Sequence, residues 1–174
     1  RRVLFRSPEE APFARLSRRA DPTGLLALSR AWSDDIDRRM APARVLLPAA
    51  PARTTEGKPT IGYLSSDLRN HAVGHLMRQV IARRDRSRFR VVALSYGPDD
   101  GSEYAEAFRT DSDRFIDLAG VDSLQAAGLI REAGVDILID LNGYTGAFRM
   151  DIPSLRPAPL QVLFFGFAGT SGAS

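Results

Sequence analysis

Residues 61–77 read IGYLSSDLRNHAVGHLM, and this stretch indicates the fold class of the chain. An apolar, β-forming run ends in a polar loop that carries Asp67 and His71, and a helical pattern begins after the loop. Open α/β sheets bind ligands at the carboxyl ends of their parallel strands. An imidazole there can exchange protons near neutral pH, which makes His71 a candidate site residue. Loop histidines also serve as helix caps or packing groups, and that interpretation stays open.

Strand and helix patterns alternate along the chain from residue 60 onward. The predicted strands cover residues 60–65, 88–96, 115–118, 135–141 and 160–165, and the predicted helices cover 73–84, 102–109 and 122–133. Such alternation predicts a Rossmann-like α/β fold, a parallel sheet with right-handed crossovers and helices on both faces. The loop after the first strand lacks GxGxxG, and the chain has no GxxxxGK[ST], so dinucleotide and P-loop sites are not expected.

The organisation of the chain changes near residue 60. Residues 8–58 are predicted to be a helical connector and linker, in which Pro12 and Pro22 break the helical pattern and prolines from Pro42 onward mark the linker. Residues 59–174 are predicted to form the Rossmann-like lobe. Residues 1–7 read RRVLFRS, which a common sequencing-adapter tail encodes in frame, so we interpret them as a non-native tail and exclude them from the fold.

Composition excludes several classes of function. The length of 174 residues and the 44% hydrophobic content suit one domain with a buried core. The net charge of +3 falls to about zero without the arginines of the tail, so nucleic acid is not an expected partner. No cysteine is present and two histidines do not complete a zinc site, so no metal is expected. No apolar run approaches the roughly 20 residues that span a bilayer, and we expect a cytoplasmic protein.

Polar segments follow three of the predicted strands, at residues 65–75, 140–145 and 166–172. These segments should converge, because the carboxyl ends of parallel strands lie along one edge of the sheet. Two of these segments also have a purely structural interpretation. Asn142 and Gly143 suit a turn as well as a site. The GTSG segment suits either the binding of a sugar or phosphate oxygen or an ordinary loop. We interpret His75 as a cap or packing residue, and Asp99 and Asp100 as turn formers.

Several linked motifs of the chain resemble one known family. They read, in order, GYLSSDLRNHAVGHLM, LSYGPDDGSEY, RFIDLAG, DILIDLNGYT, LRPAPLQV and GTSGA. In this order they resemble the O-linked N-acetylglucosamine transferases of glycosyltransferase family 41, including bacterial and SPINDLY-like members. The resemblance runs from about Pro59 to the last residue. The helical residues 8–50 resemble the connector between the family's tetratricopeptide repeats and its catalytic core.

The resemblance implies the amino-terminal lobe of a two-lobed GT-B glycosyltransferase. Such an enzyme moves N-acetylglucosamine from UDP-N-acetylglucosamine to serine or threonine hydroxyls of proteins, with inversion and without a metal or other cofactor. The implied partners are a UDP-sugar, a protein acceptor, a missing C-terminal catalytic lobe and upstream tetratricopeptide repeats. Asp67 and His71 fall on the family's active-site aspartate and histidine. The substrate-binding residues that we predict are Asn70, Asn142, Tyr144, Thr145, Gly166, Gly169, Thr170 and Ser171.

The sequence departs from the family pattern beside the sugar pocket. Residues 71–73 read His-Ala-Val where the family has His-Pro-Thr, and residues 167–168 read Phe-Ala where it has Tyr-Pro, so the donor sugar stays open. Residues 37–55 also lack the connector histidine that animal members carry. Two alternatives remain: a non-catalytic nucleotide-sugar or protein-binding module, and a GT-B enzyme with another UDP-sugar donor. We expect the 174 residues alone not to turn over.

Overall fold

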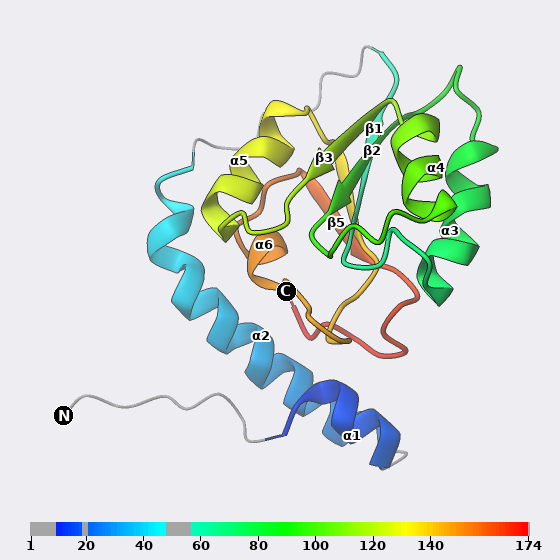
Figure 1. Cartoon of the computed structure of the whole chain (residues 1–174). Helices are drawn as coiled ribbons and strands as arrows, with labels where there is room; N and C mark the ends of the chain where they lie inside the picture. Colours follow the sequence, from blue (N-terminus) through cyan, green and yellow to red (C-terminus); the bar gives the residue numbers. More distant parts are fainter. Residues whose placement is uncertain (1–9, 19–20, 48–56, 174) are drawn as a thin grey trace.

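A computed structural model describes residues 10–18, 21–47 and 57–173 of the chain (Figure 1). The predicted tail at residues 1–7 and most of the predicted linker, residues 48–56, lie outside the described residues. The centre of the described part is a five-stranded parallel sheet with helices packed on both faces. This arrangement confirms the predicted Rossmann-like α/β fold.

The sheet has the order β3-β2-β1-β4-β5, with the first strand in the centre. The strands are β1 (Thr60–Ser65), β2 (Arg90–Ser95), β3 (Arg114–Asp117), β4 (Ile137–Asp140) and β5 (Leu160–Leu163). Ser65 lies opposite Ser95 of β2, and Leu64 lies opposite Asp140 of β4. The loops that follow these three strands therefore begin side by side at one edge of the sheet.

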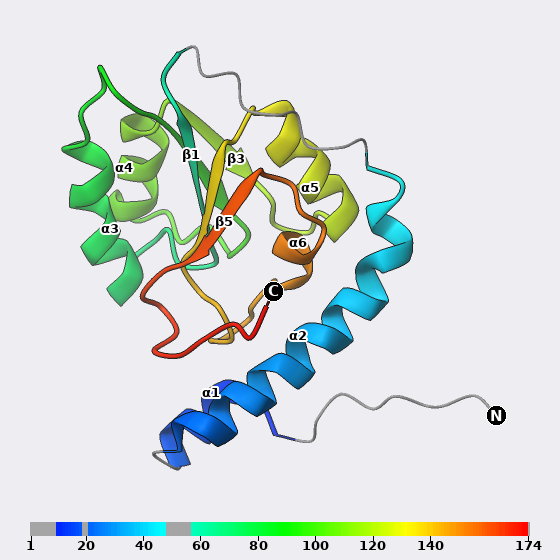
Figure 2. The ribbon, with the colours of Figure 1, turned by 180° about the vertical axis from the view of Figure 1, so that it is seen from behind.

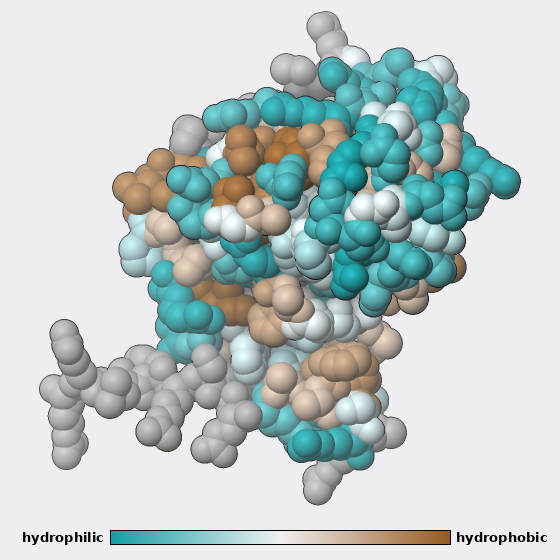
Figure 3. Space-filling view, in the orientation of Figure 1, coloured by the Kyte–Doolittle hydropathy of each residue, from teal (hydrophilic) through white to brown (hydrophobic). Residues whose placement is uncertain are grey.

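Two pairs of helices cover the two faces of the sheet (Figures 1 and 2). One face carries α3 (Ala72–Ala82) and α4 (Glu103–Asp111), and the other carries α5 (Ser123–Glu132) and α6 (Asp151–Ser154). Alternate residues of β1 and β2 point to opposite faces, so each face has its own apolar cluster. On the side of α4 the surface is mainly hydrophilic, as the right of Figure 3 shows.

Two helices precede the sheet, α1 (Pro12–Arg18) and α2 (Pro22–Arg44). Pro12 and Pro22 each begin a helix, where the missing N–H of proline costs no hydrogen bond. Pro42 was predicted to begin the linker but lies within α2, close to its end. The long helix packs against the loops after β4 and β5 through a cluster of five buried side chains, Leu25, Ile36, Tyr144, Met150 and Phe167.

The predicted elements differ from the observed ones mainly at their ends. Val135 and Leu141 are buried in the core but lie outside β4, because an apolar run shows burial and not the limits of strand pairing. The helix α6 was not predicted, since its four residues are too few to show a helical period. Within the described residues, no helix is long and apolar enough to cross a membrane.

Candidate functional site

The loop between β1 and α3 carries the predicted pair Asp67 and His71. His71 is the N-cap of α3, and its Nδ1 accepts the N–H of Val73 at 3.3 Å. A Cβ atom at Gly74 would lie 2.0 Å from the carbonyl oxygen of Arg69. A glycine is therefore required for the loop to fold back onto the first turn of the helix. The capping role that the sequence left open is thus present, and it fixes the ring at the helix end.

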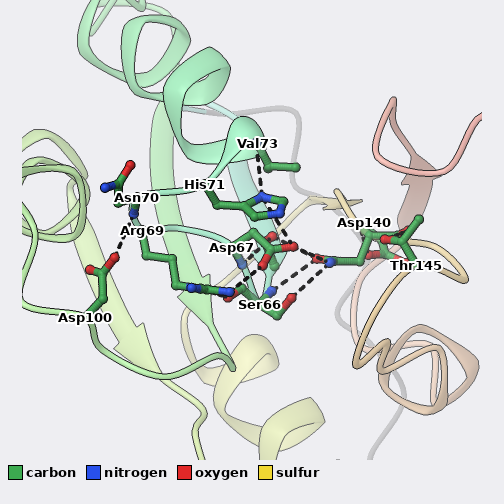
Figure 4. Close-up of polar contacts among 11 residues, drawn as sticks. Ser66, Asp67, Arg69, Asn70, His71, Val73, Asp100, Asp140 and Thr145 are labelled. Carbon is green, nitrogen blue, oxygen red and sulfur yellow. Dashed lines mark hydrogen bonds and ion pairs between the residues drawn. The ribbon is translucent and has the colours of Figure 1, made fainter.

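The two predicted site residues differ in their exposure. The side chain of His71 is 43% exposed, whereas that of Asp67 is only 12% exposed. Figure 4 shows the imidazole directly above the carboxylate, and His71 Nδ1 lies 3.8 Å from Asp67 Oδ2. Because Nδ1 accepts the N–H of Val73, the neutral ring carries its proton on Nε2. The site thus presents an imidazole to a ligand and keeps the carboxylate behind it.

Asn142, in the loop after β4, joins that loop to the loop after β1. Its Oδ1 accepts the Ser65 hydroxyl at 2.8 Å and the N–H of Ser66 at 3.1 Å. Its Nδ2 donates to Ser66 Oγ at 3.0 Å and to Asp67 Oδ2 at 2.8 Å. Asn142 is 1% exposed, so these bonds form away from water. An amide is needed here, because the position both accepts and donates.

Asp140 fixes the backbone of Asn142 and Gly143 by hydrogen bonds. Its two carboxylate oxygens accept the N–H groups of Asn142 at 2.9 Å and Gly143 at 3.2 Å. Burial raises the pKa of Asp140 to about 6, although these two N–H groups partly offset that rise. Thr145 closes the same turn by donating its hydroxyl to the carbonyl of Asn142 at 2.8 Å. The segment therefore forms the turn that the sequence allowed, and its contact with a substrate stays a prediction.

Asn70 lies at the exposed side of the β1 loop, directly before His71. Its backbone N–H donates to Asp100 Oδ2 at 2.9 Å, and its side-chain Oδ1 lies 2.8 Å from Nε2 of His75. The His75 ring stacks on Tyr104 of α4 with a centroid separation of 4.4 Å. His75 therefore has the packing role predicted for it.

The loop after β5 touches the β4 loop and then turns onto α2. A Cβ atom at Gly166 would lie 1.7 Å from the carbonyl oxygen of Leu141, so the two loops meet backbone to backbone. Beyond that point the contacts are with the long helix. The hydroxyl of Tyr144 donates to the carbonyl of Ser171 at 2.9 Å, and a Cβ atom at Gly172 would lie 2.4 Å from the backbone of Arg30.

A family model places this arrangement among known proteins. The model of glycosyl transferase family 41 matches residues 47–174, which include all three loops. The chain belongs to glycosyltransferase family 41. Asp67, His71 and Asn142 therefore lie in the part of the chain that is shared with the family.

Two relatives of the chain carry similar names. The chain is 41% identical over 115 residues to a UDP-N-acetylglucosamine--peptide N-acetylglucosaminyltransferase of Caenorhabditis elegans, covering 66% of this chain and 10% of that protein. It is 32% identical over 173 residues to the probable UDP-N-acetylglucosamine--peptide N-acetylglucosaminyltransferase SEC of Arabidopsis thaliana, covering 96% of this chain and 18% of that protein. The chain thus spans a small part of these relatives.

A solved structure has the same fold as the described chain. It is a mutant of the O-GlcNAc transferase of Thermobaculum terrenum, with a TM-score of 0.75 and 31% sequence identity. The match covers 88% of this chain and 29% of the solved chain. The fold described here is therefore also found in part of a longer O-GlcNAc transferase.

The structure brings only some of the predicted residues together. Asp67, His71 and Asn142 form one connected group, and Gly166 adjoins it through Leu141. Asn70 is joined to this group by its peptide bond to His71, whereas its hydrogen bonds run to Asp100 and His75. Tyr144 is buried at 2% exposure, and the segment from Gly169 to Ser171 lies toward α2. Their predicted contacts with a substrate stay predictions.

Sequence reasoning missed four polar residues that support the group, Ser65, Ser66, Asp100 and Asp140. Ser65, Ser66 and Asp140 lie at strand ends, which was the available signal, whereas Asp100 lies in the turn before α4. Ser65 and Ser66 bond Asn142 at separations of 77 and 76 residues, and Asp100 bonds Asn70 at a separation of 30, so no local pattern pairs them. Among the described residues, no group of three or more histidine, aspartate or glutamate side chains could hold a metal ion.

Proposed function

We propose that this chain is the first lobe of the catalytic region of a protein O-glycosyltransferase. The longer enzyme moves N-acetylglucosamine from UDP-N-acetylglucosamine to serine or threonine hydroxyls of proteins. The observation that carries the proposal is the exposed imidazole of His71 beside the amide-held carboxylate of Asp67, at the carboxyl edge of a family 41 sheet. The names of the relatives support the donor and the peptide acceptor.

Transfer at an anomeric carbon needs an acceptor oxygen held in line and a route for its proton. In the capping state, Nε2 of His71 donates a hydrogen bond and positions an oxygen of the sugar or the acceptor. For Nε2 to accept a proton, the ring must carry its own proton on Nδ1, release the N–H of Val73 and turn toward Asp67 Oδ2. Asp67 is the group that stabilises this second state.

The remaining predicted residues have supporting roles in this proposal. Asn70 and Gly166 lie at the rim of the site, while Asn142 and Tyr144 hold the loops from within. Gly169, Thr170 and Ser171 offer backbone groups to the donor. The second catalytic lobe binds most of the UDP, and upstream tetratricopeptide repeats bind the acceptor protein. The reaction needs no metal or other cofactor, and the enzyme works in the cytoplasm.

The test is sugar transfer by the full-length gene product with several UDP-sugars. With UDP-N-acetylglucosamine, His71→Ala and Asp67→Asn should each lower kcat/KM by about a hundredfold, the usual effect of losing a positioned acid–base group. Asp99→Asn is the matched control, because the hydrogen bonds of Asp99 to Gly101 and Arg109 stay within the β2–α4 turn and α4.

Three outcomes separate the alternatives. Unchanged turnover in both site variants would remove the proposed site. Preference for another UDP-sugar would favour a different GT-B enzyme, and binding of UDP-sugar without transfer would favour a non-catalytic module.

A further inference from the structure

The turn between β2 and α4 lies against the loop that carries Asp67 and His71. The N–H of Tyr96 donates to the carbonyl of Ser65 at 3.0 Å. A Cβ atom at Gly97 would lie 1.9 Å from the carbonyl oxygen of Ser66, so the two backbones are in close contact. Asp100, at the other end of the turn, accepts the N–H of Asn70. The turn therefore contacts the loop on both sides of Asp67.

Both carboxylate oxygens of Asp100 are used in this arrangement. Oδ1 accepts the N–H of Ser102 at 3.0 Å, and Oδ2 accepts the N–H of Asn70 at 2.9 Å. Hydrogen bonds from Ser102, with a smaller contribution from Asn70, lower the pKa of Asp100. The group is therefore a carboxylate at neutral pH, and its hydrogen bonds are charge-assisted.

Asn70 transmits this contact to His71, because the two residues share a peptide bond. The N–H of His71 donates to the carbonyl of Arg69 at 2.8 Å, which makes a tight turn around Asn70. Figure 4 shows Asp100 bonded to Asn70 on one side of the loop and the His71 ring above Asp67 on the other. A shift of Asn70 would therefore move the exposed imidazole of His71 relative to Asp67.

We propose that Asp100 is a positioning residue that holds the loop of Asp67 and His71 in its working geometry. This inference rests on the proposed function and assigns to it a residue in a neighbouring βα unit. The substrates are those of the proposed function. Asp100 fixes the loop and does not touch them.

The alternative role of Asp100 is to form its own turn, and Asp99 provides the comparison. Asp99 Oδ1 accepts the N–H of Gly101 at 3.0 Å, and its Oδ2 accepts Nη2 of Arg109 at 2.6 Å. Both of these bonds stay within the β2–α4 turn and α4. Each aspartate thus holds one N–H of the turn, but the second bond of Asp99 goes to Arg109 of α4, whereas that of Asp100 goes to Asn70 in the loop of Asp67 and His71.

The test compares Asp100→Asn with Asp99→Asn in the full-length gene product. In Asp100→Asn one of the two oxygens becomes an NH2 donor, which cannot accept the N–H that it faces. The negative charge is also lost, so the bond to Asn70 is either broken or no longer charge-assisted. In Asp100→Asn, we expect backbone amide hydrogen exchange at residues 68–73 to quicken about tenfold, the effect of losing one charge-assisted hydrogen bond. We also expect kcat to fall about tenfold, while KM for UDP-N-acetylglucosamine stays within about twofold.

The control should change neither quantity. Unchanged exchange at residues 68–73 in Asp100→Asn would overturn the proposal, and so would faster exchange without a fall in kcat. An equal fall in kcat in both variants would reduce Asp100 to a turn former and would also overturn it. If the unmodified protein transfers no sugar, the proposed function fails, and the exchange comparison decides by itself whether Asp100 holds the loop.

Discussion

Two loops leave the same edge of the sheet and are held in place by different kinds of contact. The loop after β1 is tied to its neighbours by hydrogen bonds through Asn142 and Asp100, and it leaves His71 exposed. The loop after β5 is tied by apolar packing on α2, with Phe167 buried at 3% exposure. Position at the carboxyl edge therefore indicates where a site can form. What covers each loop determines which side chains a ligand can reach.

The largest effect is expected from Asn142→Asp, which tests the polar side of this comparison. The change replaces the Nδ2 donor with an oxygen that faces Asp67 Oδ2, where the present bond is 2.8 Å. Two buried carboxylates at that distance cannot both ionise without a large cost. We expect the free energy of unfolding to fall by about 3 to 5 kcal/mol at pH near 7. Chemical denaturation measures it.

The same variant has a distinctive pH dependence. At acid pH one carboxyl of the pair takes up a proton and can donate as the amide does, so the loss should shrink as the pH falls. Asn142→Ala removes the bonds without adding a charge, and its loss should lack this part of the pH dependence. Equal pH profiles for the two variants would contradict the network as described.

The second effect concerns the contact between the two regions. In Gly166→Ala, the new Cβ would lie 1.7 Å from the carbonyl of Leu141, and backbone atoms must move to admit it. We expect a loss of about 2 to 4 kcal/mol in the free energy of unfolding. Gly128→Ala is the control, because its Cβ meets nothing within 4 Å on α5. That change should stabilise the helix by about 0.5 to 1 kcal/mol. A neutral Gly166→Ala would show that the β5 loop is free to move.

The sequence predicted the sheet because burial repeats locally, as in Thr60–Ser65, whose limits match the structure. The loop of Asp67 and His71 was predictable for the same reason, since it directly follows that strand. The role of Asn142 was not predictable, because its partner Asp67 lies 75 residues away and an Asn-Gly pair also makes a turn. The packing of residues 169–172 on α2 depends on tertiary contacts that no local pattern contains.

The third effect tests the burial of Asp140, beside Asn142, through the pH dependence of the free energy of unfolding. Burial raises the pKa of Asp140 to about 6, above the value of about 3.9 in an unfolded chain. Between these values the folded state binds more protons than the unfolded state, so the free energy of unfolding falls as the pH rises. Asp140→Asn removes this titration.

The measurement is denaturation of both proteins at about pH 4 and about pH 8. From the lower to the higher pH, the free energy of unfolding of the wild type should fall by roughly 1 to 3 kcal/mol more than that of Asp140→Asn. Asp140→Asn also loses one acceptor for an N–H group, which lowers the free energy of unfolding at both pH values. This loss cancels when the change between the two pH values is compared for the two proteins. The same pH dependence in both proteins would show that Asp140 is better solvated than its position indicates.

The smallest effect comes from Tyr144→Phe, which tests the apolar side of the comparison. The change removes the hydroxyl bonded to the carbonyl of Ser171 and keeps the ring that packs edge-on against Trp32 and Phe167. We expect a loss of about 1 kcal/mol, the usual net worth of one hydrogen bond. Amide exchange should quicken at residues 169–173 and stay unchanged at residues 66–71. Tyr104→Phe keeps the ring stacked on His75 and should alter neither segment. Faster exchange in both segments of Tyr144→Phe would mean that the two loops open together, so that the long helix stabilises the His71 site as well.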